Sequence, residues 1–131
     1  MPGSTICKSA GASGGEAMTD ADFWEVERSL WLGSAAAFRA WVAADCVMVL
    51  PEPAGIVTGR AIIDGVKAGP RWGRIDFAAP LVRRPGTEAA VLADRAEAER
   101  PDGVPYRALC SSSYLRQAGA WWLVQHQQTP L

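Results

Sequence analysis

Histidine, the residue type most suited to acid–base chemistry near neutral pH, occurs once in this chain, at His126. It lies in the C-terminal stretch AWWLVQHQQTPL, residues 120–131, where an apolar segment ends among glutamines. An imidazole titrates near neutral pH and can transfer a proton or contact a ligand. It can also be a structural or interface residue, and the sequence leaves both hypotheses open. A metal site is not predicted, because no second histidine and no nearby cysteine accompany His126.

A second candidate is Asp94, which lies in a segment where small apolar residues alternate with charged ones. If residues 88–99 form a strand, Asp94 is the lone acid on its face. The other residues of that face are Ala90, Leu92, Ala96 and Ala98. A desolvated carboxyl group has a raised pKa and can act as a general base or acid near neutrality. The alternative is an ion pair at the sheet surface, with Arg95, Arg107 or Arg116 as the partner.

Tryptophan is the one residue type in clear excess, with six copies in 131 residues. Aromatic rings fill cores and also line ligand pockets, and in a small domain the pocket is the part of the core left unfilled. Together with the family resemblance described below, which implies a pocket, the tryptophans lead us to expect an aromatic-lined site for a small, mostly apolar molecule. Its predicted ligand-binding residues are Trp24, Trp41, Met48, Tyr114, Trp121, Gln125 and Gln127. The neutral amides of the two glutamines suit a polar, uncharged ligand better than an acid.

Composition and charge argue against several classes of protein. At 131 residues, with 49% hydrophobic and 21% charged residues, the chain is predicted to be one globular domain. Its longest apolar run, around residues 41–50, contains Asp45 and is far short of the roughly 20 residues of a membrane-spanning helix. The formal net charge is -1 without a basic cluster, so nucleic acid is not an expected partner. No cofactor is implied, and no phosphate-loop motif occurs.

The cysteines indicate a reducing environment. Cys7, Cys46 and Cys110 are odd in number and widely spaced, and they form no CxxC or metal-binding pattern. We therefore expect free thiols and a cytoplasmic location. Residues 1–18, rich in glycine, serine and alanine, lack the apolar stretch of a secretory signal. They are predicted to be a flexible tail, with Met18 as an alternative start of the chain.

Capping residues, periodicity and turn residues place the elements that must position these side chains. Helices are predicted over residues 19–33, 34–45 and 60–67. Strands are predicted over residues 46–50, 55–58, 75–84, 88–99, 105–116 and 120–129. The order ααββαββββ, with the helices on one side of a curved antiparallel sheet, is an α+β fold formed by residues 19–131.

Several stretches resemble the SnoaL-like group of the nuclear transport factor two-like superfamily. They are FRAWVAADCVMVLP after a tryptophan-bearing helix, TGRAIIDG at the entry of the third helix, and YLRQAGAWWLVQHQQTP at the C-terminus. The resemblance covers residues 19–131 and implies a cone-shaped α+β barrel, with the sheet wrapped on the N-terminal helical hairpin around a conical pocket. It also implies a homodimer formed through the outer face of the sheet. Because the superfamily includes isomerases, hydrolases, cyclases and assembly domains, it does not specify a function.

The pairing of the last two strands decides which of their residues share a face. With Ala118-Gly119 as a two-residue turn and strict alternation, the hairpin has two mixed faces. One is predicted to hold Ser112, Tyr114, Trp121, Leu123, Gln125 and Gln127, and the other Ser111, Ser113, Trp122, Val124, His126 and Gln128. The resemblance favours Trp121 on the cavity side, since it matches a Gly-x-Trp motif of the family. His126 is then expected on the outer, dimer-facing side.

The sequence leaves open the register of the preceding hairpin. If Asp94 faces Ser111, and beyond it His126, the row superficially resembles a hydrolytic triad. Such a cross-strand row lacks the sharp nucleophile turn and the oxyanion donors that this chemistry needs. A slip of one residue instead moves Asp94 to the face of Ser112.

Two functions are compatible with these residues. The first is a small-molecule-binding domain without catalysis, because the sequence has one histidine and no clear acid/base pair. The alternative is an isomerase, cyclase or hydratase in which Asp94, or else His126, is the general base. An exposed Asp94 would contradict the second hypothesis. Two ionisable groups within hydrogen-bonding reach in one enclosed cavity would argue against the first.

Overall fold

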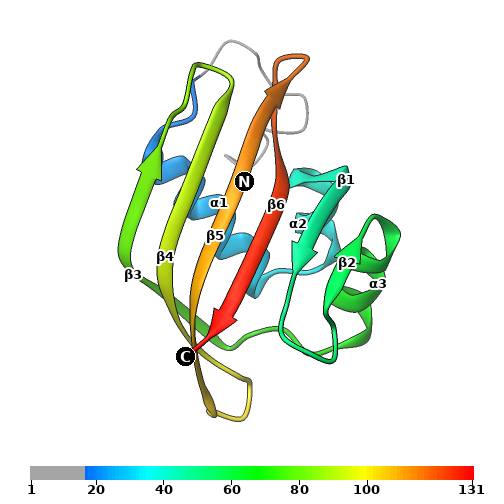
Figure 1. The fold of residues 1–131 in the computed structure, drawn as a ribbon. Helices are drawn as coiled ribbons and strands as arrows, with labels where there is room; N and C mark the ends of the chain where they lie inside the picture. The colour runs from blue at the N-terminus through cyan, green and yellow to red at the C-terminus, as the bar shows by residue number, and fades with distance from the viewer. Residues whose placement is uncertain (1–16) are drawn as a thin grey trace.

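The computed structural model describes residues 17–131, which form three helices and one six-stranded sheet (Figure 1). The helices are α1 (Asp20–Leu32), α2 (Ala35–Trp41) and α3 (Arg60–Ala68). The strands are β1 (Val42–Val49), β2 (Ile56–Thr58), β3 (Arg74–Arg83), β4 (Ala89–Glu99), β5 (Pro105–Gln117) and β6 (Ala120–Pro130). This succession confirms the predicted order ααββαββββ. The predicted tail lies outside the described residues except for Ala17 and Met18.

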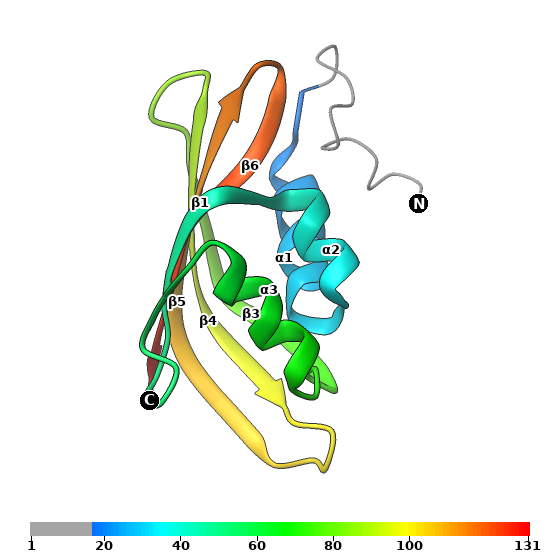
Figure 2. The ribbon, with the colours of Figure 1, turned by 90° about the vertical axis from the view of Figure 1, so that its right-hand side faces the viewer.

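The sheet is open and curved, with the strand order β2-β1-β6-β5-β4-β3. Figure 2 shows all three helices on its concave side, which confirms the α+β class. Neighbouring strands are antiparallel except β1 and β6, which are parallel, so the expectation of an antiparallel sheet needs this one correction. Parallel pairing requires a long crossover, which the chain between β1 and β6 supplies. No helix in residues 17–131 combines the length and the apolar character needed to cross a membrane.

Helix α1 has its capping signals in the sequence and buries one face against the sheet. The Thr19 hydroxyl accepts a hydrogen bond from the Asp22 N–H at 3.0 Å, and the Asp22 carboxylate accepts one from the Thr19 N–H at 2.9 Å. The helix ends at Gly33, where a Cβ would come within 2.3 Å of the Ser29 carbonyl oxygen. The buried residues of α1 are Phe23, Val26, Glu27, Leu30 and Trp31. Glu27 is the one charged member of this apolar stripe.

Helix α2 is shorter than the sequence predicts. A helix is expected over residues 34–45, but α2 ends at Trp41 and β1 begins at Val42. The cap is as predicted, because the Ser34 hydroxyl accepts a hydrogen bond from a backbone N–H of the first turn at 3.3 Å. The early end has a tertiary cause: Val42 pairs with Leu123 of β6, and the strand ladder satisfies backbone groups that a longer helix would have used.

A bulge in β6 interrupts the alternation predicted for the C-terminal hairpin. The two-residue turn forms as predicted, and Tyr114 lies opposite Leu123. The register then shifts, so that Ser113 pairs with Gln125 and Val124 is left without a partner in the ladder. One extra residue in a strand moves every later side chain to the opposite face of the sheet.

The bulge turns the candidate histidine inward. His126 lies opposite Ser112 and faces the concave side with Gln128, and it is only 7% exposed. Gln125 and Gln127 alternate with these residues and face outward. The predictions that His126 faces outward and that the two glutamines face the cavity are therefore wrong. A turn-based register cannot anticipate a bulge, because Val124 looks like any other apolar strand residue.

The observed register of β4 and β5 is the alternative in which the hairpin is shifted by one residue. Asp94 lies opposite Cys110 and shares the concave face with Ser112. The row of Asp94, Ser111 and His126 is therefore not formed. Asp94 is 8% exposed, so the alternative of a surface ion pair is also excluded. On its other side lies an irregular part of β3, where the register with β4 shifts after Ala78.

The core between α1 and the sheet fixes where the helix lies. The Phe23 ring contacts the rings of Tyr114 and Trp121, with centroid distances of 5.0 and 5.2 Å. Met18, which precedes the helix, is also buried in this core. These contacts fix the position of the first half of α1 over β5 and β6. Glu27, one turn after Phe23, is thereby held against the middle of the concave face.

Candidate functional site

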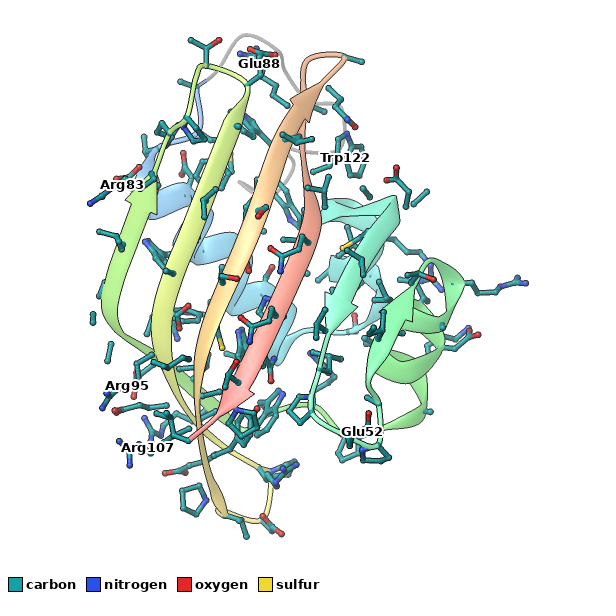
Figure 3. All side chains as sticks on the ribbon, viewed as in Figure 1. Glu52, Arg83, Glu88, Arg95, Arg107 and Trp122 are labelled. Atoms are coloured by element: carbon teal, nitrogen blue, oxygen red, sulfur yellow. The ribbon has the colours of Figure 1, made fainter. Side chains whose placement is uncertain are left out.

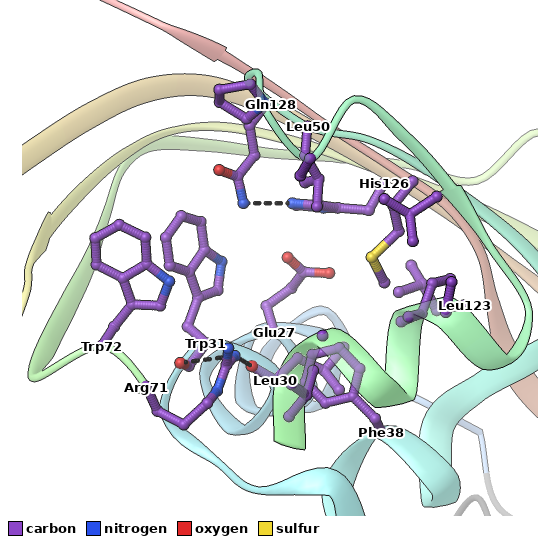
Figure 4. Close-up of a pocket in the computed structure, with 18 of the residues that line it drawn as sticks. Glu27, Leu30, Trp31, Phe38, Leu50, Arg71, Trp72, Leu123, His126 and Gln128 are labelled. Atoms are coloured by element: carbon purple, nitrogen blue, oxygen red, sulfur yellow. Dashed lines mark hydrogen bonds between the residues drawn. The ribbon is translucent and has the colours of Figure 1, made fainter. Parts of the chain in front are cut away.

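A cavity of about 620 Å³ lies between the concave face of the sheet and the helices (Figure 4). Most of its wall is apolar and includes Leu30, Trp31, Phe38, Met48, Ile62 and Leu123. Its polar and charged lining residues are Glu27, Glu52, Arg71, Arg100, Tyr106, His126 and Gln128. The volume lies in the range of small-molecule sites, which are mostly apolar and orient their ligands with a few polar groups.

The Glu27 carboxylate is the charged group of the inner wall. Figure 4 shows it in the middle of the cavity, between Trp31 and His126. It is 3% exposed, and the Tyr114 hydroxyl donates a hydrogen bond to its Oε2 atom at 2.6 Å. Burial, and then the charge of Glu27 and this hydrogen bond, raise the pKa of Tyr114 well above its usual value, so the phenol remains a donor. Of this hydrogen-bonded pair only Glu27 lines the cavity, and Tyr114 lies behind the wall and holds the carboxylate in place.

His126 belongs to a row of hydrogen bonds on the concave face. Ser112 Oγ lies 2.8 Å from Nδ1, and the Gln128 amide donates to Nε2 at 3.1 Å. The Tyr106 hydroxyl in turn donates to the Gln128 carbonyl oxygen at 2.9 Å. Because Nε2 accepts, the ring proton is on Nδ1 and is donated to Ser112. Burial lowers the pKa of His126, an effect that the charge of Glu27 partly offsets, so the imidazole is neutral.

Asp94 is buried on the concave face but is not among the residues that line the cavity. Burial, and then the negative charge of Glu27, raise its pKa to about 7. Its Oδ2 atom has no hydrogen-bond partner among residues 17–131. The carboxyl group therefore titrates near neutrality, and its charge is coupled to that of Glu27.

The predicted site residues divide into three groups. Met48 and His126 line the cavity, while Tyr114 and Asp94 lie behind its wall and interact with Glu27. The other predicted residues do not line it: Trp24, Trp41 and Trp121 pack in or against the core, and Gln125 and Gln127 lie on the outer face. Among residues 17–131, no group of three or more His, Cys, Asp or Glu side chains is placed to hold a metal ion.

Several cavity residues were not predicted from the sequence. Those that matter most are Glu27, Arg71, Trp72, Arg100, Tyr106 and Gln128. A signal for Glu27 existed, because it lies four residues after Phe23 and three before Leu30, on the apolar stripe of the helix. Arg71 and Arg100 lie between regular elements, where periodicity gives no information on side-chain direction.

Comparison with solved structures identifies the class of fold. A protein of Parabacteroides distasonis proposed to be a ketosteroid isomerase superposes with a TM-score of 0.75 at 16% identity, over 95% of this chain and 96% of that chain. An NTF2-like protein of unknown function in nutrient uptake from Rhodospirillum rubrum gives a TM-score of 0.74 at 20% identity, over 86% and 98%. The association domain of C. elegans CaMKII gives 0.65 at 15% identity, over 82% and 88%.

The protein therefore has the NTF2-like fold, the nuclear transport factor two-like architecture that the sequence resemblance predicted. No protein-family model matches the sequence, and no curated protein matches it. The identities to the structures above are 20% or less, so these comparisons show the fold alone. The activity must be argued from the residues of the site.

Proposed function

We propose that the protein binds a small, mostly apolar molecule with one or two oxygen functions in the cavity between the sheet and the helices. The observation that carries this proposal is an apolar cavity of about 620 Å³ whose inner wall holds the buried carboxylate of Glu27. Burying a charge in an apolar wall is costly unless hydrogen bonds compensate for the lost water, and among residues 17–131 the Tyr114 hydroxyl alone donates one to this carboxylate. A ligand group that interacts with Glu27 would offset part of the cost of burying its carboxylate.

Filling the cavity from helix α3 tests the proposal. Gly65 lines the cavity, and a Cβ added to it would meet no atom within 4 Å. We expect Gly65→Trp to weaken binding of the neutral fluorophore Nile red by at least about tenfold, because the indole occupies the space that the probe needs. The measurement is the rise of Nile red emission on titration with protein.

The matched control is Gly65→Ala, which also replaces the glycine of the helix but adds only one methyl group to the cavity. It should bind Nile red as the wild-type protein does, and both variants should melt at or above the wild-type temperature. Equal Nile red binding by the tryptophan variant and the wild type would place the dye elsewhere and remove the support for this cavity.

A second candidate function is proton transfer on the bound molecule. Its specific support is that Glu27 reaches into the cavity while a neutral phenol, Tyr114, holds its carboxylate in place. Glu27 has the strongest position for a general base, since both ring nitrogens of His126 already have protein partners. Asp94 does not line the cavity, so its part would be to modulate Glu27 through their mutual charge.

The reaction that suits this wall is a shift of a proton between two carbon atoms of a carbonyl compound. Glu27 would take the proton from the carbon next to the carbonyl, and the electron pair would delocalise onto the carbonyl oxygen as an enolate. In a substrate with a carbon–carbon double bond β,γ to the carbonyl group this anion is a dienolate, and return of the same proton to the γ carbon moves the double bond into conjugation without gain or loss of atoms. The description of one structural neighbour as a proposed ketosteroid isomerase supports this reaction class.

We also propose a homodimer through the outer face of the sheet, which Figure 3 shows from the front. That face exposes apolar side chains between charged ones, among them Val91, Leu109 and Leu115, which are 37%, 47% and 37% exposed. An association domain among the structural neighbours supports self-assembly. A monomeric mass in sedimentation equilibrium would contradict the proposed dimer.

The free, buried thiols of Cys46 and Cys110 support a reducing, cytoplasmic location.

A further inference from the structure

Two arginines line the cavity on the side where its lining residues are open to solvent. Arg100 comes from the turn between β4 and β5, and Arg71 from the segment between α3 and β3. Both flank Trp72, which also lines the cavity. Glu52, from the segment between β1 and β2, is the one exposed acid in the lining. The rim therefore carries two cations against one anion, whereas the carboxylate in the interior of the lining is Glu27.

The Arg100 guanidinium lies against two aromatic rings of the cavity lining. It lies over the Trp72 ring, 4.9 Å from the centroid, and 5.7 Å from the centroid of Tyr106. These two rings are stacked on each other at 4.9 Å. The turn itself is fixed, because the Arg100 N–H donates to the Val104 carbonyl at 2.9 Å. Among residues 17–131, no carboxylate or other acceptor bonds the guanidinium N–H groups of Arg100.

The Arg71 guanidinium is also fixed, and one of its nitrogens is unused. Its Nε donates to the Gly33 carbonyl at 2.8 Å, and Nη2 donates to the carbonyls of Leu30 and Trp31 at the end of α1. No hydrogen bond of Nη1 is formed with residues 17–131. Burial lowers the pKa of Arg71. A nearby anion would offset part of that effect.

We infer that the ligand of this cavity carries a carboxylate group at its outer end, bound by the guanidinium N–H groups of Arg100, with Arg71 as a second cation in the same lining. The inference rests on the proposed small-molecule site and names the chemistry of its ligand. A guanidinium edge donates two parallel N–H bonds, which match the two oxygens of a carboxylate. This replaces the expectation of an uncharged ligand, which depended on Gln125 and Gln127 facing the cavity.

The distribution of charge also fixes the orientation of the ligand. An anionic group placed at the inner wall would meet Glu27, and behind it Asp94, in a medium of low dielectric constant. The same group at the rim meets Arg100 and Arg71. The apolar part of the ligand then lies inside, against Trp31 and Leu123, and carries any reacting carbon toward Glu27.

The test compares two compounds of nearly equal shape, 2-naphthylacetate and 2-naphthylacetamide, as competitors of Nile red at about pH 7.5, where the acid is ionised. The wild-type protein should bind the carboxylate about tenfold more tightly than the amide, and added salt should reduce this preference. Arg100→Gln should abolish the preference by weakening the carboxylate alone, while Arg100→Lys, which keeps the charge but loses the planar fork, should retain part of it.

The matched control is Arg107→Gln, which removes one positive charge from an exposed side chain of β5 that does not line the cavity. This variant should keep the wild-type preference. Equal binding of the two compounds by the wild type, failure of the carboxylate to displace the dye, or a preference that survives in Arg100→Gln would overturn the inference while leaving the cavity as a binding site. Failure of Nile red to bind the wild type at all would instead overturn the proposed function and this inference with it.

Discussion

The Glu27→Gln variant is expected to exchange deuterium from D2O into the methyl group of 2-acetylnaphthalene at least about 100-fold more slowly than the wild-type protein. This ketone is neutral and apolar and has protons next to its carbonyl group. A carboxylate in an apolar cavity can accept such a proton, whereas an amide cannot. Mass spectrometry of the recovered ketone measures the exchange over time.

The amide variant should keep the shape of the site, which makes the comparison clean. The Tyr114 hydroxyl can still donate to an amide oxygen at the position of the Glu27 carboxylate. Nile red affinity should therefore stay within about twofold of the wild type. The matched control is Glu25→Gln on the exposed side of α1, which should leave the exchange unchanged. Exchange that persists in Glu27→Gln, with binding intact, would remove Glu27 as the base and leave the protein as a binding domain.

The Asp94→Asn variant is expected to become more stable relative to the wild type as the pH rises. In the folded protein the pKa of Asp94 is about 7, above its ordinary value of 3.8. Between about pH 4 and pH 7 the folded state therefore keeps a proton that the unfolded chain has lost, so the wild type loses stability over this range. The full effect is up to about 4 kcal/mol, at 1.36 kcal/mol for each pH unit.

Urea unfolding at pH 5 and at pH 8 measures this effect. The gain of Asp94→Asn over the wild type should grow by about 2–3 kcal/mol between these values. His126 acts in the opposite direction, because burial lowers its pKa and its protonation below about pH 6.5 favours the unfolded chain. That contribution is common to both proteins and largely cancels in the difference. A difference independent of pH would show that Asp94 is not protonated in the folded state near neutrality.

The elements could be predicted wherever local signals and tertiary structure agree. Thr19 and Asp22 form the capping box of α1, and Gly33 ends the helix as its sequence position indicates. The end of α2 could not be predicted, since the pairing of Val42 with Leu123 joins residues from opposite ends of the chain. Local propensity contains no information on such a partner.

The site was predicted less well than the fold, for two physical reasons. A single unpaired residue, Val124, reverses the facing of His126 and of every residue after it, and its side chain carries no mark of the bulge. The charged rim depends on Arg71 and Arg100, whose directions are set by stacking and by helix-end carbonyls. Glu27 is different, because its place on an apolar helical stripe was visible in the sequence.

The central claim is that a small molecule binds in the cavity lined by Trp31. The most direct test is NMR spectroscopy of the indole N–H groups of the six tryptophans. Titration with 2-acetylnaphthalene should shift the resonances of Trp31 and Trp72, the two tryptophans that line the cavity. Those of Trp24 and Trp122 should remain in place, and single Trp→Phe variants assign the signals. Shifts confined to Trp122, which lines a separate cleft beside Arg39, would contradict the claim.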